Sequence, residues 1–95
     1  MSIINTKRGD TEVTLKVNMD LTESTVRVLV RPRRSTGFTV LPSTVTVAAK
    51  GTLTAVTSDL PVGLYDLEVE VTQGGKVSTF PDTGYVILSV NADLG

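Results

Sequence analysis

One alternating segment constrains the fold of this chain more than any other. In residues 65–72 apolar side chains alternate with polar ones, and the apolar positions are Tyr65, Leu67, Val69 and Val71. Successive side chains of a β-strand point to opposite faces, so this segment is predicted to bury one face and expose the other. Two glycines then separate it from a second alternating segment at residues 76–80. The pattern predicts a β-hairpin.

Valine and threonine alternate in several other short segments, and helical spacing is not sustained in any of them. The predicted strands are residues 12–19, 25–31, 38–41, 43–49, 52–57 and 85–90, and residues 1–8 form an N-terminal arm or a short edge strand. Pro32 ends one strand because proline lacks the donor that a ladder needs. Pro42 leaves two short strands or one broken edge strand around it. Leu53 and Val56 differ in parity, which predicts a bulge or a change of sheet.

Short strands at regular intervals predict the fold class. The chain of 95 residues is 40% hydrophobic, which suffices for one small core. We predict an all-β fold, an immunoglobulin-like β-sandwich of about seven or eight antiparallel strands, as a single domain over residues 1–95. Cysteine and tryptophan are absent from the sequence, which argues against an antibody-type domain.

Turn chemistry accounts for the predicted connections between these strands. Residues 7–10, which include the tripeptide Arg8-Gly9-Asp10, are interpreted as a turn and not as an integrin-binding loop, because glycine and aspartate favour turns. Residues 20–24 form a tight polar connection with Leu21 as an apolar plug beneath it. Residues 81–84 form a β-turn.

Composition excludes several classes of function. The net charge is −1, so no long-range field draws the protein to nucleic acid or to an anionic membrane. The chain has no histidine and no cysteine, and it contains no phosphate-binding glycine loop, so we expect neither an enzyme nor a cofactor or metal. It also lacks a signal peptide and a membrane span, so we expect it to be made in the cytoplasm.

Two segments are candidate protein contacts. Arg31, Arg33 and Arg34 form a basic cluster around a proline, which is expected to be solvated or to meet an acidic partner surface. Ile3 and Ile4 lie in the N-terminal arm. Loops and arms often carry function while strands carry the scaffold, so these five residues are the predicted contacts.

A row of acidic residues and the few aromatic residues complete the set of candidates. Asp66, Glu68 and Glu70 line the polar face of the alternating segment. They are interpreted as a solvated or partner-facing row, which pairs with Arg27 and Lys76 if the strand is covered; calcium binding is the alternative. Most of the four aromatic residues are predicted to lie in the core: Phe38, Tyr65, Phe80 and Tyr85.

Together these segments resemble a known family. The residues concerned are 7–11, 20–22, 24–28 and 60–69, with the two-glycine hairpin leading to residues 77–81. Their order is similar to that in the immunoglobulin-like N-terminal domain of bacteriophage baseplate upper proteins, over nearly the whole chain. Members of that family continue into a linker and fibre segments, whereas this chain ends at Gly95, so it is expected to be the docking unit alone. The segment 31–41 is longer and more basic than the family pattern.

The resemblance implies a function. It implies a virion protein without catalytic activity that docks to tail or baseplate proteins, in several symmetric copies, after synthesis in the host cytoplasm. One alternative is a capsid decoration protein that clamps neighbouring capsomers with its arm and its arginine loop. Another is a module that binds carbohydrate or a receptor on the host surface, which would need exposed aromatic side chains.

Overall fold

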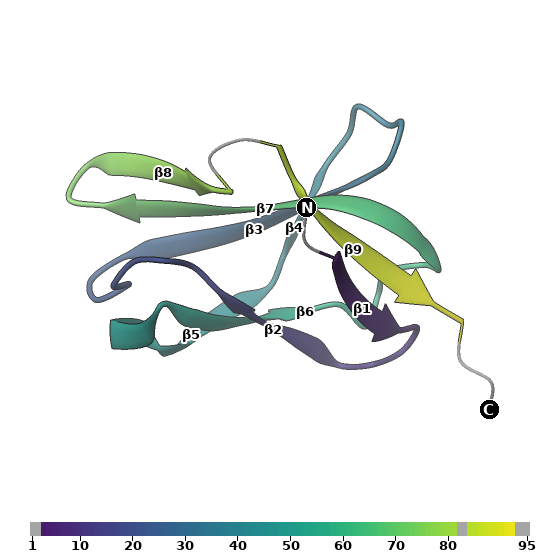
Figure 1. The fold of residues 1–95 in the computed structure, drawn as a ribbon, viewed down its shortest axis with the longest axis horizontal. Coiled ribbons are helices and arrows are strands. Elements are labelled where there is room, and N and C mark those ends of the chain that lie inside the picture. The colour runs from purple at the N-terminus through teal and green to yellow at the C-terminus, as the bar shows by residue number, and fades with distance from the viewer. Residues whose placement is uncertain (1–2, 82–83, 93–95) are drawn as a thin grey trace.

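The structure, a computed structural model, describes residues 3–81 and 84–92. These residues form nine β-strands and one short 3-10 helix, which loops and turns connect (Figure 1). In chain order they are β1 (Ile3–Lys7), β2 (Glu12–Lys16), β3 (Thr25–Pro32), β4 (Thr39–Leu41), β5 (Ser43–Val47), η1 (Ala48–Lys50), β6 (Thr52–Val56), β7 (Gly63–Gln73), β8 (Lys76–Phe80) and β9 (Val86–Asn91). The all-β prediction is confirmed. The strand number exceeds the predicted seven or eight because the N-terminal segment and both segments around Pro42 form strands.

The strands form two sheets that face each other (Figure 1). The large sheet has the order β1-β9-β7-β3-β4, with β8 also paired to β7, and the small sheet has the order β2-β6-β5. Neither sheet closes on itself. The arrangement is compatible with a β-sandwich.

Strand β7 is the centre of the large sheet. Along one edge it pairs with β3, from Thr25 opposite Thr72 to Pro32 opposite Tyr65. Its other edge is shared, because β9 pairs with its first half and β8 with its second half. The predicted hairpin of residues 65–80 is confirmed, and it provides the strand to which most of the large sheet is attached.

The pairing of the two ends of the chain corrects one expectation. β1 runs parallel to β9, with Ile3 opposite Ile87 and Lys7 opposite Asn91, so the strands are not all antiparallel. After β1 the chain passes through both sheets before β9 brings it back beside β1. Such a long connection permits a parallel pair, whereas a tight hairpin would force an antiparallel one.

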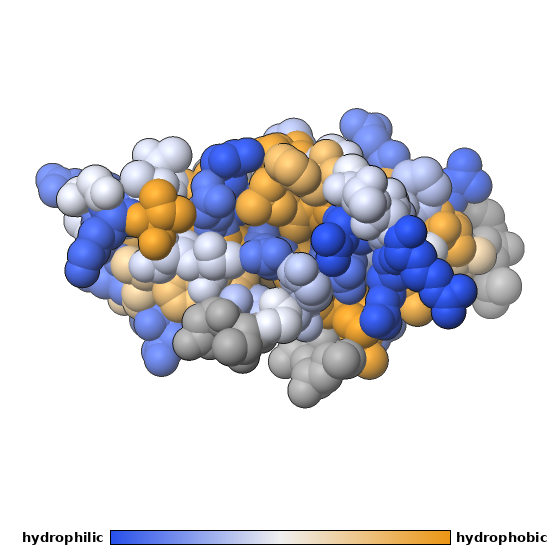
Figure 2. Space-filling model, turned by 90° about the horizontal axis from the view of Figure 1, so that it is seen from above, coloured by the Kyte–Doolittle hydropathy of each residue, from blue (hydrophilic) through white to orange (hydrophobic). Residues whose placement is uncertain are grey.

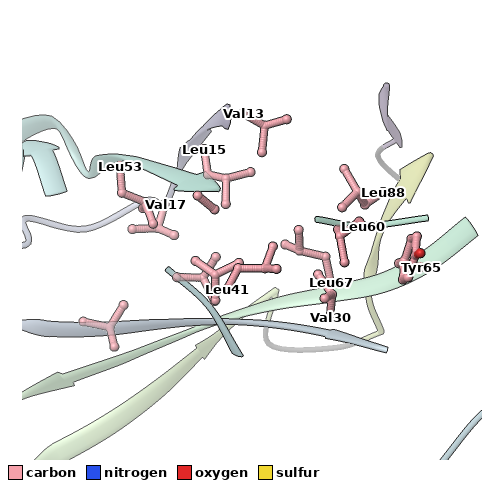
Figure 3. Packing of buried hydrophobic residues seen from close by; sticks show 14 of the residues in the cluster. Val13, Leu15, Val17, Val30, Leu41, Leu53, Leu60, Tyr65, Leu67 and Leu88 are labelled. Carbon is pink, nitrogen blue, oxygen red and sulfur yellow. The ribbon is translucent and has the colours of Figure 1, made fainter. Parts of the chain in front are cut away.

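Inward-facing side chains of both sheets form the core (Figure 3). In β3 and β7 the predicted parity is confirmed, since Val28, Val30, Leu67 and Val69 are all buried. Leu21 is 2% exposed, as expected of a plug.

The bulge predicted within residues 52–57 occurs in the neighbouring strand instead. β6 alternates regularly, with Leu53 and Ala55 buried, while Val56 faces outward and is half-buried. The irregularity lies in its partner β5, between Val45 and Val47. Alanine is a weak marker of a core position in a sequence, so the regular inward parity through Ala55 is not evident from the apolar pattern.

Several strand bounds, and the role of Pro42, also differ from the predicted ones. β4 and β5 belong to different sheets, so Pro42 marks a change of sheet. β2 ends at Lys16 and not at residue 19, although the Val17 amide still donates to the Gly51 carbonyl oxygen at 2.9 Å. The predicted turn at residues 7–10 is confirmed by a hydrogen bond from the Asp10 amide to the Lys7 carbonyl oxygen. The predicted turn at residues 81–84 includes residues 82 and 83, which lie outside the described residues.

Candidate interaction face

The outward surface of the large sheet, called here the outer face, combines apolar and charged side chains. Figure 2 looks down on it and shows apolar groups in orange between charged groups in blue. Its apolar and charged members from the strands include Ile3, Arg27, Leu29, Arg31, Val40, Leu64, Asp66, Glu68, Glu70, Val77 and Ile87. The outward surface of the small sheet carries mainly threonine, including Thr14, Thr44 and Thr54. The two surfaces therefore differ in chemistry.

Ion pairs cross the outer face between β3 and β7. Arg27 lies opposite Glu70 in the register, and their side chains meet at 3.1 Å. Arg31 lies opposite Asp66 at 3.0 Å, and Arg33 reaches the same carboxylate at 3.6 Å. The predicted pairing of the acidic row with Arg27 is confirmed. The predicted pairing with Lys76 is wrong, because that residue lies opposite Gln73 beside the turn.

Arg31 is held from two sides. Its guanidinium carbon lies 4.9 Å from the centroid of the Tyr85 ring, within the range of a cation–π contact. The hydrogen bond to Asp66, and secondarily the contact with Tyr85, raises the pKa of Arg31 above its already high value. The side chain is thus charged at every working pH and fixed over the sheet.

A surface pocket of about 310 Å³ lies beside these ion pairs. Phe38 and Tyr85 line it together with Arg31, Asp66 and Glu68. Phe38 is 61% exposed and Tyr85 is 40% exposed. Two aromatic rings and several charged groups therefore meet in one open pocket.

The exposure of these two rings contradicts the prediction that most aromatic residues lie in the core. Tyr65 is buried and Phe80 packs against the core, but Phe38 and Tyr85 do not. For Tyr85 the exposure could have been predicted from the sequence. Its neighbour Val86 faces inward, and adjacent residues of an extended chain point to opposite sides. Phe38 precedes β4 in a loop, where alternation gives no guide.

The structure separates the five predicted contact residues. Arg31 and Arg33 meet at Asp66, whereas Arg34 is exposed in the loop with a backbone φ of 69°. Ile3 is 59% exposed and stands in one cross-strand row with Arg31, through Ile87 and Asp66.

Ile4 points the other way and packs against the core. The N-terminal segment is thus an edge strand and not a free arm, and it offers Ile3 but not Ile4 to a partner. The row that joins Ile3 to Arg31 could not be read from the sequence, because it depends on the parallel pairing of β1 with β9.

The described residues contain no group of three acidic, histidine or cysteine side chains that could hold a metal ion. None of their helices is long and apolar enough to cross a membrane. In the Arg8-Gly9-Asp10 turn, the Asp10 carboxylate accepts hydrogen bonds from the Lys7 amide at 3.2 Å and the Thr6 hydroxyl at 3.5 Å. The Asp10 side chain therefore stabilises the turn in which it lies.

No family model matches the chain, and no curated protein is significantly similar to it.

Proposed function

We propose that the chain is an immunoglobulin-like β-sandwich. In that fold one sheet holds strands B, E and D, and the other holds G, F and C with C′ beside C. The order β2-β6-β5 corresponds to the first group, and β9-β7-β3-β4 corresponds to the second. A further feature supports the assignment: the Tyr65 hydroxyl, at the start of the strand equivalent to F, donates to the Pro61 carbonyl oxygen at 2.7 Å. This is the geometry of a tyrosine corner.

The function that the outer face supports best is docking to another protein. We place the chain among bacteriophage virion proteins without catalytic activity, as a domain associated with the tail or baseplate. The phage assignment rests on the resemblance to baseplate upper proteins, and the mode of action rests on the outer face. Its ion pairs neutralise most of its charge, while exposed Phe38, Leu64 and Tyr85 supply apolar contact area. A neutral surface with aromatic anchors suits a protein partner.

Purified virions provide the test. Mass spectrometry is expected to find the protein in particles, and electron microscopy is expected to place it on the tail in symmetric copies. Phe38→Glu is expected to reduce its incorporation at least about tenfold, because it puts a charge at the centre of the contact. Thr54→Glu, the matched change on the small sheet, is expected to leave incorporation unchanged. Absence of the protein from particles would reject the proposal, and equal effects of both variants would reject the outer face.

A position on the head would instead favour a capsid decoration protein. That alternative uses β1 and the loop of residues 33–38 to bridge neighbouring capsomers. The same reconstruction distinguishes the two, since tail and head density do not overlap.

One observation favours a second class of function, carbohydrate binding. Phe38 and Tyr85 line the same pocket as Asp66 and Glu68, and sugar sites combine aromatic stacking with polar groups in this way. A glycan array is the test. Binding that is lost in both Phe38→Ala and Tyr85→Ala would support this function, and an array without hits would reject it.

A further inference from the structure

A second surface, separate from the outer face, lies at the side of the molecule between the two sheets. There a cleft of about 340 Å³ runs along β2. Its floor consists of buried apolar side chains from both sheets, among them Leu15, Val17, Leu67 and Val69. Its far wall is formed by Phe80 and Val86, each at the end of its strand. The cleft is thus an opening into the side of the core.

The backbone of β2 forms the near wall of this cleft. Five consecutive residues, 14–18, line it, from β2 to two residues beyond its end, so residues of both parities take part. Only the edge of a strand presents both faces to one cleft. Within the described residues β2 pairs with β6 alone, which leaves this edge without a neighbouring strand.

The hydrogen-bond register shows which backbone groups point into the cleft. The Val17 amide donates to Gly51, and the Thr57 amide donates to the Thr11 carbonyl oxygen. Bonded pairs alternate along an antiparallel ladder, so the odd-numbered residues of this segment bond to β6. The N–H and C=O groups of Thr14 and Lys16 therefore point toward the free edge. They form a template for one more strand.

From these features we propose that the cleft is a strand-accepting site. It takes an extended segment of a partner protein that pairs antiparallel with β2 and becomes a fourth strand of the small sheet. Every second side chain of the segment is apolar and fills the cleft, because the floor of the cleft is apolar. Of the described residues that line the cleft, Lys16 alone carries a charge. The incoming strand therefore carries an acidic residue on its outward face, opposite Lys16.

A designed peptide tests the proposal on the full chain. The probe is the blocked peptide Thr-Val-Thr-Val-Glu-Val-Thr-Val-Thr, and amide hydrogen exchange is followed by NMR. Exchange of the Thr14 and Lys16 amides is expected to slow at least about tenfold when the peptide is added. The Leu15 and Val17 amides, already bonded to β6, serve as internal controls. Slowing elsewhere, or nowhere, would overturn the proposal.

A charge exchange tests the role of Lys16. Lys16→Glu is expected to weaken binding of the glutamate peptide about fivefold to tenfold and to strengthen binding of the matched peptide with lysine in place of glutamate. Lys50→Glu makes the same change of charge in η1, outside the cleft, and is expected to alter neither affinity. Equal responses of the two variants would refute the assignment of the acidic residue.

Strand pairing itself is tested without changing the protein. The same peptide, N-methylated at its glutamate and threonines, keeps every side chain but cannot donate hydrogen bonds to the β2 edge. It is expected to bind at least about tenfold more weakly than the parent. Equal affinity would show that the cleft binds side chains without adding a strand. None of the three peptide experiments involves the outer face, so this proposal and the docking function can fail independently.

Discussion

At Tyr65 a polar group lies at the margin of the core. Its hydroxyl donates to the Pro61 carbonyl oxygen across the turn into β7, and the residue is 6% exposed. Burial raises the pKa of Tyr65 above its ordinary value of 10.0, because the phenolate would lose hydration. The hydroxyl is thus protonated and able to donate at neutral pH, and burial extends this range to higher pH.

Replacing this residue tests both effects. Tyr65→Phe is expected to lower the free energy of unfolding at neutral pH by about 1 kcal/mol, because the hydrogen bond is lost. Since the folded state retains the proton more tightly than the unfolded state, wild-type stability from this residue is full below pH 10 and declines as the pH rises through the raised pKa. The variant lacks that decline. Urea unfolding of wild type and variant at neutral pH and above pH 10 measures both effects.

Asp66 joins two arginines on the outer face, because its carboxylate pairs with both Arg31 and Arg33. Its side chain is only 12% exposed. Asp66→Asn is expected to lower the free energy of unfolding by about 1–2 kcal/mol, since Arg31 loses a charged acceptor. Glu70→Gln removes a more exposed pair and is expected to cost about 0.5 kcal/mol or less. Chemical denaturation of both variants compares them, and an equal cost would contradict the central role of Asp66.

At the scale of elements, the link between β5 and β6 depends on one glycine. Gly51 has a φ of 69° and follows η1. A Cβ at this position would overlap the Val17 carbonyl oxygen and lie 2.6 Å from that of Met19. The segment that follows β2 therefore packs directly on this turn, and no side chain fits between them.

A pair of glycine substitutions separates backbone strain from crowding. Gly51→Ala is expected to lower the free energy of unfolding by about 3 kcal/mol or more, because strain and overlap add. Gly9 has a similar φ of 89°, but a Cβ there meets no described atom within 4 Å. Gly9→Ala should therefore cost about 1 kcal/mol, from strain alone. Thermal and urea unfolding give both values, and equal costs would show that crowding at Gly51 is relieved by relaxation.

For the whole molecule, the pairing of β1 with β9 joins the two ends of the described chain. Strands β3 and β7 also pair across a long stretch of sequence. Loops must close before such contacts form, so folding is expected to take about milliseconds to seconds and to proceed in one cooperative transition. Stopped-flow refolding followed by circular dichroism and by tyrosine fluorescence tests this. Microsecond folding, or different rates for the two probes, would contradict it.

The alternation of apolar and polar residues predicted much of the fold and part of the outer face. Alternation located the strands around Val28 and Leu67 and their inward faces. It also placed Arg27 and Glu70 on outward faces, from which their pairing followed. It did not reveal that Gln73 donates through its side-chain amide to the carbonyl oxygens of Asp20 and Thr22, because that contact joins a strand end to a distant loop.

The sequence by itself determined the all-β class, the central hairpin and which side chains of most strands face inward. These properties depend on neighbouring residues, since a period of two is a property of the extended backbone. Tertiary structure decided the division into two sheets, the parallel β1–β9 pair, the pocket with Phe38 and Tyr85, and the cleft beside β2. Each of these depends on which distant segments meet, and a strand edge or an exposed ring looks the same in the sequence whether or not another segment covers it.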